Sequence, residues 1–263
     1  MLTRLWFFPL ILAVTTLAIS PNIFSEPIVV RVNSSQFPPY SYEKAHTNTS
    51  ITDDMLTVIN AFQSKYHFTL VHGPVMRRFY SFEKGRYDLS FFDHLHWGWA
   101  QYAVQATRVY LRGGEKYVAL AKAGRGQEYF NDFKNKVLGG FLGYHYGVAN
   151  FNSDPKVLKK DFNMELSTTH EGNLLKVIEQ RIDVAILTDA FLSRYLIEHP
   201  QYQDQLLVSD VWDQEYSFSI VVRDGASPSV EELNELLHQM ERARALYPVW
   251  EKYGIPPAAY EVN

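Results

Sequence analysis

The stretch VIEQRIDVAILTD, from Val177 to Asp189, decides the fold because it joins a helix end, a charged turn and a continuous apolar strand. An earlier stretch, SFEKGRYDLSFFD from Ser81 to Asp93, repeats this order of helix end, arginine, aspartate and apolar strand. Near-continuous apolar runs are typical of parallel strands that helices cover on both faces. The repeat therefore predicts an α/β protein with two lobes built on one plan.

Both of these predicted strands end in polar residues. Asp93 closes the first strand, and the pair Thr188 and Asp189 closes the second. In open α/β sheets, ligands lie beyond the carboxyl ends of the strands. Two lobes whose strand ends face each other would therefore form a ligand cleft that contains these residues.

The first 25 residues have the composition of a secretory signal peptide, with Arg4, an apolar run from Leu5 to Ile19 and a polar stretch ending at Ser25. A membrane anchor is the alternative, but this run is shorter than the about 20 residues that span a bilayer. A globular pattern also begins at Pro27. We expect cleavage after Ser25 and export of the mature chain.

Composition narrows the possible partners. The chain has no cysteine, so it contains neither a disulfide framework nor a lipid-anchored cysteine. Its 25 basic and 29 acidic side chains are evenly spread and give a formal net charge of −4. This mild balance does not indicate nucleic acid or an anionic membrane as a partner.

A proline-fixed aromatic loop follows the first predicted strand, Ile28 to Val32. The segment SSQFPPYSY, Ser34 to Tyr42, presents Phe37, Tyr40 and Tyr42 from this loop. Aromatic side chains on a rigid loop suit a platform for a ligand. A plug for the end of the core is the alternative.

Two further segments carry aromatic residues beside glycines. Trp97 precedes Gly98 in the aromatic segment from Phe92 to Tyr110, where it suits the grip of a flat ligand or, alternatively, a place in the core. The turn GYHYG, Gly143 to Gly147, offers backbone N–H groups to an anionic or carbonyl group. The alternative is an ordinary turn between a strand and a helix.

The sequence offers little for metal or covalent chemistry. His94 and His96 would share one face of an extended segment, but spacing positions no third ligand, so we expect no metal site. The chain has neither a cysteine nucleophile nor a G-x-S-x-G motif. We expect a binding protein with no catalytic residue and no cofactor.

The α/β pattern restarts at two apolar strands, KYVALAK from Lys116 to Lys122 and YSFSIVV from Tyr216 to Val222. These strands are expected to cross between the lobes. The first lobe would then comprise residues 26–118 and 219–263, and the second residues 119–218.

Helix starts are predicted from capping residues. Asp53 or Asp54 is expected to cap the helix that follows it, and Ser227 with Pro228 is expected to start a helix running through Leu246.

Taken in order, FPPYSY, GRYD, KVLGGFLGY, RIDVAILTD and WEKYG resemble the periplasmic solute-binding proteins of the polar amino-acid type. The resemblance covers the whole mature chain. It implies the two-lobed type II periplasmic-binding-protein fold, with two crossover strands and a ligand cleft between the lobes. It also implies a monomer that closes over a small solute and delivers it to an ABC transporter permease in the inner membrane.

The chain departs from the pattern of this family at the carboxylate clamp. Amino-acid binders carry a threonine after the G-x-x-D strand and an arginine three residues later, which holds the ligand's α-carboxylate by a bidentate pair. The family's spacing places Trp97 and Ala100 at these positions. Arg78 or Arg77 could supply the lost charge from the start of the neighbouring helix.

The family's aspartate for the α-ammonium falls at Thr188 or Asp189, of which we favour Asp189. Arg78 is expected to face Asp189 across the cleft, and common α-amino acids are expected to bind weakly. The alternative is that Arg78 pairs within its own helix and that Asp189 caps the helix beginning at Ala190. The predicted ligand-binding residues are Tyr40, Tyr42, Arg78, Phe92, Trp97, Gly143, Tyr144, His145, Tyr146, Thr188 and Asp189.

Two other functions are compatible with this fold. A sensory or partner-docking protein would keep the binding cleft and signal through a membrane partner. A few proteins of this fold are dehydratases that use a cleft carboxylate as general acid, a role for which Glu171 or Asp189 is a candidate.

Overall fold

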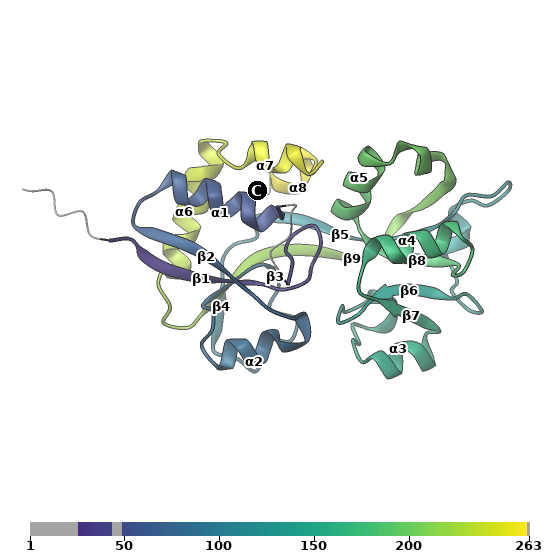
Figure 1. The fold of residues 1–263 in the computed structure, drawn as a ribbon, viewed down its shortest axis with the longest axis horizontal. Helices are drawn as coiled ribbons and strands as arrows, with labels where there is room; N and C mark the ends of the chain where they lie inside the picture. The colour runs from purple at the N-terminus through teal and green to yellow at the C-terminus, as the bar shows by residue number, and fades with distance from the viewer. Residues whose placement is uncertain (1–25, 44–48, 262–263) are drawn as a thin grey trace, which may run out of the picture.

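The computed structural model describes residues 26–43 and 49–261, so the predicted signal peptide lies outside the described residues. Figure 1 shows two lobes lying side by side, joined by the long strands β5 (Leu111–Leu120) and β9 (Leu206–Arg223). In the described part of the chain, every helix is too short or too polar to span a bilayer.

The lobe that contains the first strand is built on a mixed sheet. β1 (Ile28–Ser34) lies between the parallel strands β2 (Tyr66–His72) and β3 (Leu89–Asp93). The antiparallel partner of β3 and of β4 (Val104–Ala106) is the end of β9. The helices of this lobe are α1 (Ile51–Phe62), α2 (Arg78–Glu83), α6 (Val230–Arg242), α7 (Tyr247–Lys252) and α8 (Pro257–Tyr260), with the 3-10 turn η1 (Val75–Arg77) before α2.

The apolar faces of α1 and α6 close the core of this lobe. Met55 and Ile59 of α1, and Leu237 and Met240 of α6, pack in one buried cluster with the strands. Their helical spacing places these side chains on one face of each helix. Trp250 of α7 belongs to the same cluster.

The other lobe repeats the plan with shorter strands. β8 (Val184–Thr188) pairs antiparallel with β5 and parallel with β6 (Leu138–Phe141), which in turn pairs parallel with β7 (Met164–Ser167). Its helical segments are η2 (Gln127–Phe130), η3 (Gly147–Ala149), α3 (Pro155–Asp161), α4 (His170–Ile178), α5 (Asp189–Glu198) and η4 (Pro200–Gln205).

The crossing strand β9 is longer than the sequence pattern predicts. It pairs with β5 from Leu206 to Phe218 and then with β3 from Ser219 to Val222. The register of the pairing between β5 and β9 shifts on both sides of Lys116. Such irregularities bend a strand, which suits a strand that runs from one lobe into the other. The division of residues between the lobes stays a prediction.

Two predicted helix starts are wrong by a few residues. The cap of α1 is Ser50, and Asp53 is the third residue of a reciprocal capping box in which its carboxylate accepts the Ser50 N–H at 2.9 Å. Ser229 caps α6, which ends at Arg242, because Arg244 adopts φ +52° and interrupts the helix before α7 begins.

Candidate functional site

A cavity lies between the two lobes at the carboxyl ends of the strands. Including its opening to solvent it encloses about 570 Å³, which is within the range typical of small-molecule sites. Its walls come from the loop after β1, the start of α2, the end of β3, the turn after β6, and β9. The lining residues are Asn33, Ser35, Gln36, Phe37, Ser41, Val75, Arg78, Ser90, Phe91, Phe92, Asp93, Trp97, Gly143, Tyr144, His145, Gln214 and Tyr216.

Aromatic rings form much of the cavity wall, and Phe37 lies at their centre. Its ring centroid is 5.4 Å from that of Tyr144 in the second lobe and 6.0 Å from that of Trp97 in the first. Tyr216 of β9 packs edge-on against Trp97 at 5.0 Å. These rings join the cores of both lobes.

Arg78 and Asp93 form the charged part of the cavity. Arg78 begins α2, its guanidinium donates to the carbonyl of Trp97, and its Nη1 lies 3.9 Å from Asp93 Oδ2. Asp93 Oδ1 accepts the Trp99 Nε1–H at 2.9 Å and the His94 N–H at 2.8 Å. The hydrogen bonds from Trp99 and His94 thus hold the Asp93 carboxylate in place, and the Arg78 guanidinium lines the cavity beside it.

A chain of hydrogen bonds along the first lobe ends on Asp93. Ser35 Oγ donates to Asn33 Oδ1 at 3.0 Å, and Asn33 Nδ2 donates to Ser90 Oγ at 3.3 Å. Ser90 Oγ then donates to Asp93 Oδ2 at 2.8 Å. Ser90 therefore links the end of β1, through Asn33, to the carboxylate beside Arg78.

The second lobe contributes His145 and, through β9, Gln214. Burial and the nearby Arg78 charge both lower the pKa of His145, which favours the neutral imidazole. Gln214 Nε2 donates to Glu115 Oε2 at 2.8 Å and also to the carbonyl of His145. Gln214 therefore ties the turn after β6 to the crossing strands.

The lobes touch on both sides of the cavity. At one edge, Gly143 has φ +91°, and a Cβ there would lie 3.2 Å from Val75 and from Met76, so glycine permits the close approach. At the other edge, Thr188 Oγ1 donates to the carbonyl of Pro38 at 3.2 Å. The two lobes therefore contact each other directly at Gly143 and at Thr188.

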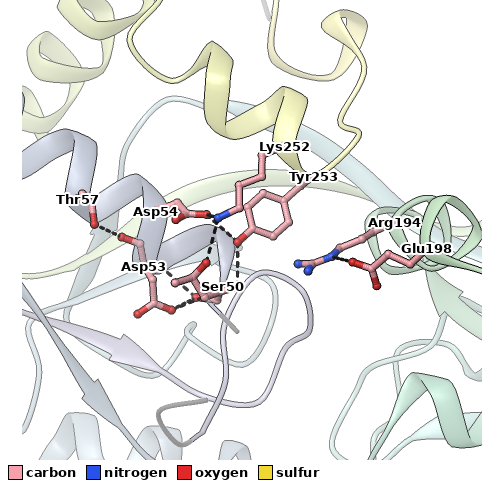
Figure 2. A network of polar contacts seen from close by, with 9 residues as sticks. Ser50, Asp53, Asp54, Thr57, Arg194, Glu198, Lys252 and Tyr253 are labelled. Atoms are coloured by element: carbon pink, nitrogen blue, oxygen red, sulfur yellow. Dashed lines mark hydrogen bonds and ion pairs between the residues drawn. The ribbon is translucent and has the colours of Figure 1, made fainter. Parts of the chain in front are cut away.

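A third contact joins the lobes at the C-terminal helices. Figure 2 shows Lys252 and Tyr253 reaching Asp54 of α1, and Arg194 of α5 pairing with Glu198. Lys252 Nζ lies 2.6 Å and the Tyr253 hydroxyl 2.8 Å from Asp54 Oδ2. The Arg194 guanidinium lies 5.2 Å from the centre of the Tyr253 ring. This cation–π contact links α5 to the first lobe.

Six of the eleven predicted ligand-binding residues line the cavity. They are Arg78, Phe92, Trp97, Gly143, Tyr144 and His145.

The other five do not line it, because each serves the packing around it. Tyr40 is buried between Phe92 and Phe218, and Tyr146 is buried with its hydroxyl on the backbone of Phe141. The carbonyl of Tyr42 accepts the Ser34 hydroxyl at 2.7 Å. The Thr188 hydroxyl binds the carbonyl of Pro38, and the Asp189 carboxylate accepts backbone N–H groups.

Asp189 is held away from Arg78. Its Oδ1 accepts the N–H of Ala190 at 2.8 Å and the N–H of Gly114 at 3.3 Å. We expected Arg78 to face Asp189 across the cleft, and this expectation is corrected, because Arg78 lies beside Asp93. Asp189 binds the start of its own helix, which was the alternative that we considered for this residue.

Sequence reasoning missed Asn33, Ser90, Gln214 and Tyr216 as lining residues. Asn33 and Ser90 lie at the ends of neighbouring parallel strands, a position that could have identified them. Gln214 lies before the predicted strand start at Tyr216 and belongs to β9 because this strand begins at Leu206.

No group of three His, Cys, Asp or Glu side chains in residues 26–43 and 49–261 is placed to hold a metal ion. The rings of His94 and His96 lie edge to face, 4.8 Å apart.

Burial raises the pKa of Asp189 from 3.8 to about 6, against the opposing effect of its backbone hydrogen bonds. The folded state then binds the Asp189 proton more tightly than the unfolded state does, so this stabilisation is complete below pH 4 and is lost as the pH rises to 6. Asp189→Asn keeps the Oδ1 acceptor but cannot titrate. We therefore expect the free energy of unfolding of this variant to change by up to about 3 kcal/mol less than that of the wild type over this pH range.

Urea unfolding of the wild type and of Asp189→Asn between pH 4 and pH 7 measures the difference. Equal slopes of unfolding free energy against pH in the two proteins would contradict the burial of a titrating Asp189.

Comparison with known proteins supports the fold strongly. No family model and no curated protein sequence matches the chain. A histidine-bound substrate-binding protein of an ABC uptake transporter from Streptococcus pneumoniae is 18% identical, with a TM-score of 0.68 over 89% of this chain and 95% of that one. The GluR0 ligand-binding core of Nostoc punctiforme, in complex with L-glutamate, is 14% identical, with a TM-score of 0.64 over 88% and 100%.

A third similar structure is an ancestral amino acid-binding protein described as a precursor of cyclohexadienyl dehydratase. It is 14% identical, with a TM-score of 0.61 over 86% of this chain and 94% of that one. At these identities the likeness shows the fold. The chain therefore has the two-lobed type II periplasmic-binding-protein fold, with a cavity between its lobes.

Proposed function

We propose that this chain is an extracytoplasmic solute-binding protein whose two lobes close over one small polar or amino-acid-like molecule. The observation that carries the proposal is the cavity between the lobes, which takes lining residues from both of them and from β9. Solute-binding proteins among the structural neighbours support it. A ligand in this position would bridge the lobes and so stabilise their closed arrangement.

Three further parts of the proposal concern the chain as a whole. Residues 26–118 and 219–263 form one lobe, and residues 119–218 form the other. The mature protein is periplasmic after loss of residues 1–25 and acts as a monomer. It delivers its solute to an ABC transporter permease, a role supported by the transporter proteins among the neighbours.

A sensory protein that docks on a membrane partner is the second candidate, and the likeness to a ligand-binding core supports it. The dehydratase alternative has less support. Glu171 is exposed in the first turn of α4, and neither Glu171 nor Asp189 lines the cavity.

Tryptophan fluorescence tests the proposed function, because Trp97 lines the cavity and is partly buried. We expect a solute that raises the thermal unfolding temperature to change the emission of the wild type. Trp97→Phe should lose most of this change, while Trp212→Phe, which alters a tryptophan outside the cavity, should keep it.

The screen should cover amino acids, organic acids, amines and sugars. If none of them changes the emission or the unfolding temperature, the solute-binding proposal is wrong. An emission change that survives in full in Trp97→Phe but is lost in Trp212→Phe would place the bound solute outside this cavity.

A further inference from the structure

We propose that the solute of this cavity is a small monocarboxylate with a flat apolar body and no ammonium group. The inference rests on the proposed binding function and names the class of molecule that the site selects. It follows from the charges that line the cavity, from the groups that already pair with them, and from the rings around them.

Arg78 is the positive charge available to a ligand. Among the described lining residues it is the one lysine or arginine, and the neutral His145 adds no second cation. Its described hydrogen bond goes to the Trp97 carbonyl and Asp93 lies 3.9 Å away, so most of its five N–H donors remain for a ligand. One guanidinium with free donors suits one carboxylate.

Asp93 is a poor receptor for an ammonium group. Its side chain is only 4% exposed, compared with 13% for Arg78. Its two oxygens already accept hydrogen bonds from Ser90, His94 and Trp99. The acceptor position that remains on Oδ2 lies beside the Arg78 guanidinium, so a ligand ammonium there would meet the Arg78 charge.

The other carboxylates near the junction of the lobes are also not available to a ligand ammonium group. Asp189, Glu115 and Asp213 do not line the cavity. Backbone N–H groups hold Asp189, Gln214 holds one oxygen of Glu115, and Asp213 accepts from Gly147, Val148 and the Tyr117 hydroxyl. Burial disfavours the charged form of all three carboxyl groups and raises their pKa.

The aromatic wall indicates the shape of the rest of the ligand. Phe37, Trp97, Tyr144 and Tyr216 come from four different segments and meet around one space. The edges and faces of such rings favour contact with another flat apolar group. The carboxylate would then lie on Arg78 and the apolar body against these rings.

A matched series of phenyl compounds tests the class by titration calorimetry on the full mature chain. 3-Phenylpropanoate carries the carboxylate alone, L-phenylalanine adds an ammonium group, and 3-phenylpropanamide removes the charge. Phenylacetate, phenylglycine and phenylacetamide repeat the comparison with a shorter body. In at least one set we expect the carboxylate to bind about ten- to a hundredfold more tightly than both of its analogues.

The preference should disappear in Arg78→Gln and persist in Arg77→Gln, because Arg77 is exposed and outside the cavity. Amino acids that bind as tightly as the matched carboxylates, or tighter, would overturn the inference and leave the binding function standing. Absence of binding by both carboxylates would overturn it too, and the broader fluorescence screen would then decide the binding function separately.

Discussion

Replacing Asp93 by alanine is expected to lower the free energy of unfolding by about 3–5 kcal/mol, because it leaves the Arg78 guanidinium without its nearby carboxylate. It also removes the acceptor for Trp99 Nε1–H, the His94 N–H and the Ser90 hydroxyl. Buried donors that lose their partners add to the cost of the lost charge.

Urea unfolding measures this change, with two variants for comparison. Arg78→Ala should cost less, since the Asp93 carboxylate keeps its three hydrogen bonds. The loss of unfolding free energy in Asp93→Asn should lie between those of Arg78→Ala and Asp93→Ala, because asparagine keeps the Oδ1 acceptor and loses the charge. A loss below about 1 kcal/mol in Asp93→Ala would contradict the structural role that we assign to this carboxylate.

Arg78→Ala is expected to weaken the binding of the tightest carboxylate in the phenyl series by about one to two orders of magnitude. The reason is the loss of a charge-assisted contact inside a partly closed cavity, where few other donors are free. Calorimetric titration of the purified variant measures the change in dissociation constant.

Arg77→Ala is the matched control, because Arg77 precedes Arg78 in the chain and carries the same charge on an exposed side chain. Its affinity should stay within about twofold of the wild type, as expected for a screened surface charge. Equal losses in the two variants would show that the effect comes from overall charge and not from a contact in the cavity.

The repeated pattern in the sequence predicted the two-lobed α/β fold correctly, for a local reason. The strand Leu89–Asp93 and the strand Val184–Thr188 both lie where the apolar runs place them, and all residues of both are buried. Apolar runs of this kind depend on burial within the lobe, so the chain reveals them without knowledge of distant contacts.

The site was predictable in part because some of its residues follow strands or begin helices. Arg78, Trp97 and Tyr144 were found from such positions. The partner of Arg78 was not found, since Asp93 ends β3 and Asp189 directly follows β8, the equivalent strand of the other lobe. Only the tertiary structure determines which of these two carboxylates reaches a given arginine.

Tyr40 and Tyr146 show a second limit of the sequence argument. Aromatic residues in rigid or glycine-bounded loops suit a ligand platform and a core equally well. Tyr40 is buried against Phe92 and Phe218, and the Tyr146 hydroxyl binds the backbone of Phe141. The ring at the centre of the wall is that of Phe37, three residues before Tyr40 in the same loop.

A crystal structure of the protein with the tightest solute found in the screen tests the central claim most directly. The account predicts one molecule between the lobes, with a carboxylate oxygen about 3 Å from an Arg78 nitrogen and its apolar body against Trp97 and Tyr216. A solute bound elsewhere on the protein, or one in this cavity that makes no contact with Arg78, would contradict it.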